Sequence, residues 1–229
     1  MLMCSPHNPV GRVWRKEELQ EAARTIIENN ALIVSDEIHA ELLFKGNTHT
    51  PTALLGEEIA QSTITCFSPS KTFNLAGLKS SVLIIPNPRV RSIFKERTAG
   101  FLSTPGILAL TAMEAAFRHG DSWLQELMTY LDQNLRFLQS FINARIPKVK
   151  VVPPEGTYLV WLDFRALELS GHDLREFLRR KAKVGFDDGF LFGTGGEGYQ
   201  RINIACPRTT LEEALNRIEK AVNKVCKQQ

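Results

Sequence analysis

The 229-residue sequence has little of several features that mark specialised classes of protein. It contains only 4 cysteines. They lie far apart, with no CxxC pair and no histidine at zinc-ligand spacing, which argues against a disulfide-rich miniprotein and a zinc finger. No stretch approaches the roughly 20 apolar residues of a membrane span. The first residues lack the charged start and apolar core of a signal peptide. These absences predict a soluble cytoplasmic protein with no membrane partner.

Charge of one sign is also scarce. The 28 basic and 25 acidic residues leave a formal net charge of only +3. A nucleic-acid-binding protein usually has a larger or more clustered positive excess, so no nucleic-acid partner is expected. The densest basic stretch, residues 175–183, has helical spacing and is interpreted as a solvated helix face. The remaining composition, 43% hydrophobic with 15 glycines and 11 prolines, is that of an ordinary globular protein.

Helical and extended patterns alternate along the chain, which predicts an α/β fold. The apolar run 31–34 is typical of a strand buried on both faces of a parallel sheet. Helices are expected at 16–29, 106–118, 121–145, 172–183 and 209–226, and strands at 31–34, 62–67, 81–85, 149–152, 157–163 and 199–205. We therefore expect a larger α/β domain over 1–120, a long connecting helix over 121–147 and a small α+β domain over 148–229.

The predicted first domain is thin. Its three or four core strands have few helices to cover them, and Met1 falls almost directly on a motif rather than before a structural lead-in. The pattern predicts that the beginning of a longer protein is missing from this sequence.

One candidate site is the hydroxyl-rich loop Ser68-Pro69-Ser70-Lys71-Thr72-Phe73-Asn74, which follows a predicted strand. A lysine among apolar and hydroxyl side chains can be desolvated, which makes its neutral amine available for Schiff-base chemistry. Ser68 and Ser70 can hydrogen-bond a phosphate, and Lys79 can supply a countercharge. The alternative interpretation is a surface turn with an ordinary solvated lysine.

A second candidate is Ser35-Asp36-Glu37-Ile38-His39, at the end of the apolar strand 31–34. Ligands of open α/β sheets bind outside the carboxyl ends of the strands. Asp36 can hold a positive charge on a cofactor ring nitrogen there, and His39 can hydrogen-bond another ring substituent. The alternative is a helix-capping aspartate followed by a partly exposed histidine.

Two further candidates lie near the chain ends. Asn8 belongs to the rigid turn Ser5-Pro6-His7-Asn8-Pro9-Val10-Gly11-Arg12 and can donate its amide to a ligand oxygen; a purely structural turn is the alternative. Arg201 lies in the apolar strand 199–205, where a charge is costly unless it is paired. Its planar guanidinium suits a carboxylate, which belongs either to a substrate or to an internal acidic residue.

Taken in order, these four signals resemble the fold-type-I pyridoxal-phosphate (PLP) enzymes of the class I/II aminotransferase superfamily. The wording of the segments 7–14, 35–39 and 70–74 is similar to the cystathionine β-lyase, or cysteine-S-conjugate β-lyase, branch. His39 carries this finer resemblance, because many aminotransferases of the superfamily have tyrosine there. The match covers nearly the whole chain but only the C-terminal part of such an enzyme, which implies a partial large domain with a mixed or parallel sheet, followed by a small α+β domain.

The resemblance also implies residue roles. Lys71 is the lysine that forms the Schiff base with PLP and moves the Cα proton of the substrate. Asp36 pairs with the pyridinium nitrogen, and Asn8 and His39 contact the ring 3′-oxygen. Ser68, Ser70 and Lys79 hold the phosphate, although Lys79 stands where aminotransferases often have arginine. Arg201 binds the carboxylate of a small amino-acid substrate, and no metal is implied.

The reaction implied is cleavage of cystathionine or another cysteine S-conjugate to a thiol, pyruvate and ammonia. An aminotransferase reaction at the same site is the first alternative. The second is a catalytically silent fragment that acts only by association, because family members carry an N-terminal segment with the backbone phosphate loop and an aromatic residue that stacks on the ring. The family is usually homodimeric, and without that segment part of the sheet surface is expected to be exposed.

Overall fold

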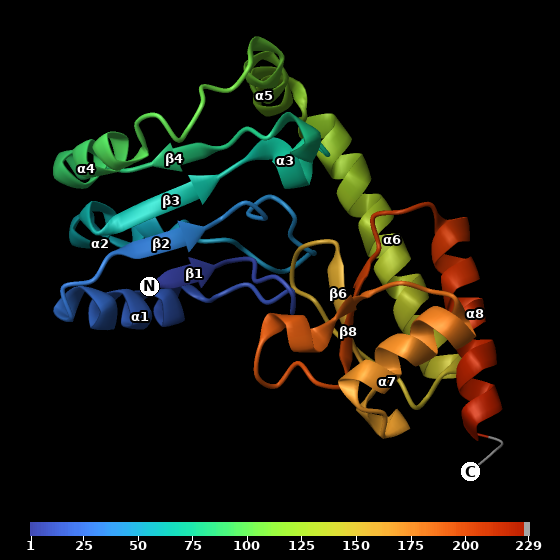
Figure 1. Cartoon of the computed structure of the whole chain (residues 1–229). Helices are drawn as coiled ribbons and strands as arrows, with labels where there is room; N and C mark the ends of the chain where they lie inside the picture. The colour runs from blue at the N-terminus through green and yellow to red at the C-terminus, as the bar shows by residue number, and fades with distance from the viewer. Residues whose placement is uncertain (227–229) are drawn as a thin grey trace. The chain divides into compact units, whose positions relative to one another are not determined.

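The structure is a computed structural model that describes residues 1–226, with side chains described for residues 1–224. The chain forms two compact units (Figure 1). The first unit contains Met1–His7 and Arg12–Glu126. The second contains Asn8–Gly11 and the chain from Leu127 onward. The turn that carries Asn8 therefore belongs with residues far away in the sequence.

The first unit is built on a four-stranded sheet with the order β1-β2-β3-β4 (Figure 1). Its strands are β1 (Leu2–Cys4), β2 (Ile33–Asp36), β3 (Thr63–Phe67) and β4 (Val82–Ile84). The first three strands are parallel and β4 is antiparallel, which confirms the predicted mixed sheet. Parallel neighbours need a crossover. The helix α1 (Lys16–Glu28) supplies one, and the short helices η1 (Thr52–Leu55) and α2 (Glu57–Gln61) lie in the other.

One face of this sheet forms the core of the first unit. Met3 and Ile33 pack there with Leu19 and Ala23 of α1 and Ile59 of α2. Side chains alternate along a strand, so the neighbours of these strand residues point to the opposite face.

The opposite face is less covered, which corrects the prediction that residues 31–34 are buried on both sides. Val34 is only half-buried, Leu32 precedes β2 and is 41% exposed, and Leu2 is 78% exposed. The strand also continues to Asp36, so that this residue ends β2 instead of following it.

The remainder of the first unit contains the short helices α3 (Pro69–Thr72) and η2 (Ala76–Leu78), followed by α4 (Pro88–Thr98) and α5 (Ile107–His119). The sequence analysis missed α4, which contains no buried residue. Its helical start is fixed by Asn87, whose side-chain oxygen accepts hydrogen bonds from the amides of Arg89 and Val90. A helix with no buried face leaves no apolar stripe to detect in the sequence.

The helix α6 (Asp121–Arg145) has the predicted bounds, and it belongs to the second unit from Leu127 onward. The second unit holds an antiparallel sheet with the order β5-β6-β8-β7. Its strands are β5 (Lys150–Val152), β6 (Leu159–Asp163), β7 (Asp187–Asp188) and β8 (Tyr199–Asn203). Its other helices are η3 (Arg165–Leu167), α7 (Gly171–Glu176), which continues as the wider turn η4 (Phe177–Ala182), η5 (Gly189–Phe192) and α8 (Arg208–Cys226).

The core of the second unit is well covered. Four consecutive residues of β6, Leu159–Leu162, are buried, as are Leu138 of α6 and Leu215 of α8. A strand buried on both faces and two helices with buried stripes give this unit an apolar interior of its own. Within the part of the chain that the structure describes, no helix is long and apolar enough to cross a membrane.

Candidate active site in two groups of residues

Parallel pairing brings Asp36 to one edge of the first sheet. In the register of the strands Asp36 lies beside Cys4 of β1 and Cys66 of β3. Its Oδ1 accepts a hydrogen bond from the amide of Ile38 at 3.2 Å, whereas Oδ2 has no hydrogen-bond or ion-pair partner among the described residues. Burial raises the pKa of the Cys66 thiol, and the carboxylates of Asp36 and Glu37 raise it further. The carboxylates of Asp36 and Glu37 therefore make the electrostatic potential at this edge of the sheet negative.

The segment after Asp36 is held by a buried hydrogen-bond network. Glu37 Oε1 accepts from the Ser35 hydroxyl at 2.8 Å and from the amide of Thr52 at 3.0 Å, and Oε2 lies 2.9 Å from His49 Nε2. Burial alone raises the pKa of Glu37, but the hydrogen bonds from His49, Thr52 and Ser35 outweigh it and hold the pKa below 4.5. His39, two residues further on, is buried. The network fixes the backbone on which Asp36 and His39 stand.

The next strand, β3, leads directly into the lysine loop. Ser68 caps α3: its hydroxyl accepts from the amide of Ser70 at 3.1 Å and donates to the carbonyl of Ser80 at 2.8 Å. The half-buried Lys71 follows, and its amine has no hydrogen-bond or ion-pair partner among the described residues. Asp36 and Lys71 thus stand at, or just beyond, the carboxyl ends of neighbouring parallel strands, where ligands of such sheets bind.

The three residues predicted to hold a phosphate differ in their surroundings. The hydroxyl proton of Ser68 is donated to Ser80, so its contacts in this structure are those of a helix cap. The Ser70 hydroxyl and the exposed Lys79 have no partner among the described residues and keep their donors available. Lys79 adopts a left-handed backbone with φ of 50° at the end of η2.

An aromatic cluster supports the loop. Phe73 lies 5.7 Å from Trp123 and 6.5 Å from Phe117, measured between ring centroids. A Cβ atom at Gly120 would lie 2.3 Å from the ring of Phe73, so only glycine permits this packing. The packing of Phe73 therefore holds the backbone of the lysine loop in place two residues after Lys71.

In the second unit, the turn that carries Asn8 is fastened at Gly11. The carbonyl of Gly11 accepts from the amides of Glu155 and Gly156 at 2.8 and 2.9 Å. Gly11 has φ of 74°, and a Cβ there would lie 2.5 Å from Cβ of Pro154. Asn8 Oδ1 accepts from Nη1 of Arg201 at 2.7 Å. The amide nitrogen of Asn8 has no partner among the described residues and is left to donate, as its predicted role requires.

The sequence analysis left open whether Arg201 has an internal partner, and the structure contains one. Arg201 lies on β8 directly opposite Asp187 of β7. Its Nε and Nη2 donate to Oδ2 of Asp187 at 3.2 and 2.5 Å. The sequence reasoning missed Asp187, because a two-residue strand is too short to show a periodic pattern. The only available signal was the pair Asp187-Asp188.

Adjacent residues of a strand point to opposite faces, which gives these two aspartates different environments. Asp188 is buried and contacts Arg175 and Gln200, whereas Asp187 is 57% exposed and contacts Arg201.

The candidate residues thus fall into two groups, each described within its own unit. Asp36, His39, Ser68, Ser70, Lys71 and Lys79 belong to the first unit, and Asn8 and Arg201 to the second. Among the described residues, no group of three His, Cys, Asp or Glu side chains is arranged to hold a metal ion.

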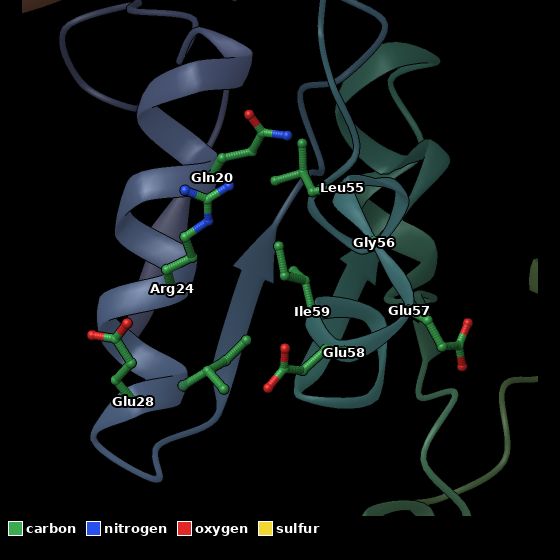
Figure 2. A pocket seen from close by; sticks show the side chains of 9 residues that line it. Gln20, Arg24, Glu28, Leu55, Gly56, Glu57, Glu58 and Ile59 are labelled. Carbon is green, nitrogen blue, oxygen red and sulfur yellow. The ribbon is translucent and has the colours of Figure 1, made fainter.

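The first unit also has a cavity of about 330 Å³ between α1 and the segment Leu55–Ile59 (Figure 2). Arg24 and Glu28 line it from α1, and Glu58 from α2. None of the candidate residues lines this cavity.

The chain belongs to the family of class I and II aminotransferases. The family model described as "Aminotransferase class I and II" matches residues 1–218, and this confirms the resemblance found in the sequence. Within that family, the chain is 41% identical over 223 residues to the cystathionine β-lyase PatB of Bacillus subtilis, covering 97% of this chain and 58% of PatB.

Solved structures agree in fold. A PLP-bound candidate aminotransferase from Clostridium difficile 630 is 45% identical with a TM-score of 0.95, over 97% of this chain and 58% of that one. PLP-containing cystalysin from Treponema denticola is 41% identical with a TM-score of 0.94, over 97% of this chain and 57% of that one. The predicted PLP-transferase-like fold is thereby confirmed. The chain spans less than two thirds of the length of these relatives.

Proposed function

We propose that this chain provides the catalytic lysine of a PLP-dependent carbon–sulfur β-lyase that cleaves cystathionine or other cysteine S-conjugates. The observation that carries this proposal is the placement of Lys71 and Asp36 at the carboxyl ends of neighbouring parallel strands, where neither the Lys71 amine nor Asp36 Oδ2 has a described partner. The similarity to PatB, which is named a cystathionine β-lyase, supports the choice of reaction.

The donors and acceptors of the candidate residues fit PLP. Asp36 Oδ2 provides a carboxylate for a protonated ring nitrogen, the amide of Asn8 and the ring of His39 provide contacts for the 3′-oxygen, and Ser70 and Lys79 provide donors for a phosphate. In this assignment Ser68 contributes chiefly by capping α3, because its proton is donated to Ser80. Bound PLP supplies an aldehyde that condenses with amines and a ring that withdraws electrons from the substrate Cα.

The protein groups then have defined tasks. Arg201 binds the substrate carboxylate through N–H groups that its contacts with Asp187 and Asn8 leave over. Lys71 Nζ accepts the Cα proton, and Asp36 holds the positive charge that makes this proton acidic. The electrons of the Cα–H bond form a Cα=Cβ double bond while the Cβ–S bond breaks and the thiolate leaves. Uptake of water by the resulting enamine gives pyruvate and ammonia.

Aminotransfer is the second candidate function, because the solved structure from Clostridium difficile is described as a candidate aminotransferase. In that reaction Lys71 would return the proton to a carbon of the cofactor instead of to Cα, and the Cβ–S bond would stay intact. The two reactions are distinguished by their products. A lyase releases pyruvate from a cysteine S-conjugate without a second substrate, whereas an aminotransferase requires an added keto acid.

The cellular setting is also a proposal. Cys4, Cys66 and Cys206 form no disulfide bond, which is usual in the reducing cytoplasm. We infer that the chain acts there, in a homodimeric assembly, on small amino acids.

The test is a visible absorbance titration of the purified chain with PLP. We expect an absorbance band that saturates in the wild type and is lost in Lys71→Ala. Lys45→Ala, which removes an exposed lysine of the same unit, is the matched control and should retain the band. Equal, weak binding by all three proteins would contradict the proposal for this chain, and would leave association with another chain as its role.

A further inference from the structure

Arg201 is neutralised by a carboxylate of its own chain before any ligand binds. Asp187 Oδ2 accepts from both Nε and Nη2, and Asn8 Oδ1 accepts from Nη1. The Arg201 side chain is only 17% exposed. The ring of Phe192 lies 4.9 Å from its guanidinium carbon. The guanidinium is thus fixed between two β-strands, a turn and an aromatic ring.

The positive charge of Arg201 nevertheless acts on the neighbouring Tyr158. Burial raises the pKa of the Tyr158 hydroxyl, and the positive charge of Arg201 acts in the opposite direction. Asp187 is more than half exposed and begins a two-residue strand, so its carboxylate has little packing of its own. An ion pair with an exposed carboxylate contributes little free energy, so it does not prevent a ligand anion from binding to the remaining N–H groups of Arg201.

We propose that Asp187 is a specificity-determining residue of the Arg201 site, which makes the site disfavour ligands with a net negative charge. This inference rests on the proposed function, in which Arg201 binds the substrate carboxylate. A ligand carboxylate that binds Arg201 lies near the carboxylate of Asp187, because both contact the same guanidinium. The two negative charges repel each other. A second carboxylate that no ammonium group of the ligand balances adds a further repulsion. Neutral amino acids and S-conjugates without net charge, including cystathionine with its two carboxylates and two ammonium groups, are therefore favoured over acidic amino acids.

The experiment uses two anions without an amine, propionate and succinate, so that neither reacts with Lys71 and no PLP is needed. Their dissociation constants are measured by NMR titration of the whole chain at constant ionic strength. We expect Asp187→Asn, which keeps the shape and removes the charge, to bind propionate about two- to fivefold more tightly than the wild type. Succinate should gain by a larger factor, so that the ratio of the two constants changes.

Two further variants locate the effect. Asp132→Asn removes one exposed-surface charge of the second unit, where Asp132 pairs with Arg136, and should bind as the wild type does. Arg201→Ala combined with Asp187→Asn should lose the gain. The proposal is overturned if Asp187→Asn binds neither anion more tightly, if neither protein binds measurably, or if the gain persists without Arg201.

A second readout applies to the PLP-loaded protein: Asp187→Asn should lower KM for an S-conjugate and leave kcat unchanged. The two proposals fail separately. Loss of Lys71-dependent PLP binding alongside the predicted anion selectivity would contradict only the lyase. Normal PLP binding with unchanged anion selectivity would contradict only the role of Asp187.

Discussion

The two units of this chain bury their apolar side chains to very different degrees. In the second unit β6 is buried over four consecutive residues, and α8 buries Leu211, Leu215 and Ile218. In the first unit α4 buries nothing and α5 buries only Ala109. Leu108 is 77% exposed and Phe101 is 88% exposed. Large apolar residues rarely stay exposed in such density on a monomeric protein.

The second unit has a well-covered core, whereas the first unit has a core on one face of its sheet and also presents apolar surface to its surroundings. The first unit carries Lys71 and Asp36, and the second unit carries Arg201. The sequence analysis expected exposed sheet surface in the first part of the chain, and Leu2, Leu83 and Ile84 are indeed exposed. The proposed chemistry therefore depends on the less well covered unit.

The largest expected effect comes from truncating the core of the second unit. Leu215→Ala removes a fully buried side chain and should lower the free energy of unfolding by about 3 kcal/mol, since a cavity is left behind. Leu108→Ala, in the exposed part of α5, should change it by less than about 0.5 kcal/mol. Urea titrations followed by circular dichroism measure both. Equal losses would show that the apolar surface of the first unit is covered in solution.

The buried network at Glu37 sets a pH dependence in the first unit. Because the pKa of Glu37 is lower in the folded than in the unfolded chain, its stabilisation is complete above pH 4.5 and is lost as the pH falls through the folded value. Glu37→Gln should therefore cost about 2 kcal/mol at pH 7 and converge with the wild type in acid.

The exposed Glu57→Gln is the control for this measurement and should follow the wild type across the pH range. Urea titrations at pH 7 and pH 3 decide the matter. A Glu37→Gln deficit of the same size at both values would show that the carboxylate charge is not responsible.

The smallest effect compares two helix caps. Asn87→Ala removes the cap of α4 and Ser170→Ala that of α7, each worth about 1 kcal/mol. Since α4 has no buried residue and α7 is anchored by Leu174, hydrogen exchange should accelerate throughout α4 but only in the first turn of α7. Equal acceleration along both helices would contradict the view that the two units differ in local packing.

Much of this architecture could be predicted from the sequence. The bounds of α6 and the approximate bounds of α1, β3, β8 and α8 follow from apolar periodicity. The elements that were missed, such as β1, α4 and β7, are short or have no buried stripe, so they leave no pattern. The correction at residues 31–34 has another cause: an apolar run shows that a strand is apolar, not what lies against each face.

The site divides in the same way. Motifs in the sequence by themselves identified the family and proposed Asn8, Asp36, Lys71 and Arg201, because local residue patterns carry that chemistry. Only the tertiary structure decided that Ser68 caps a helix, that Glu37 and His49 share a buried network, and that Asp187 faces Arg201. Each of these depends on strand register or chain reversal bringing distant residues into contact, and no local pattern specifies which side chains will meet.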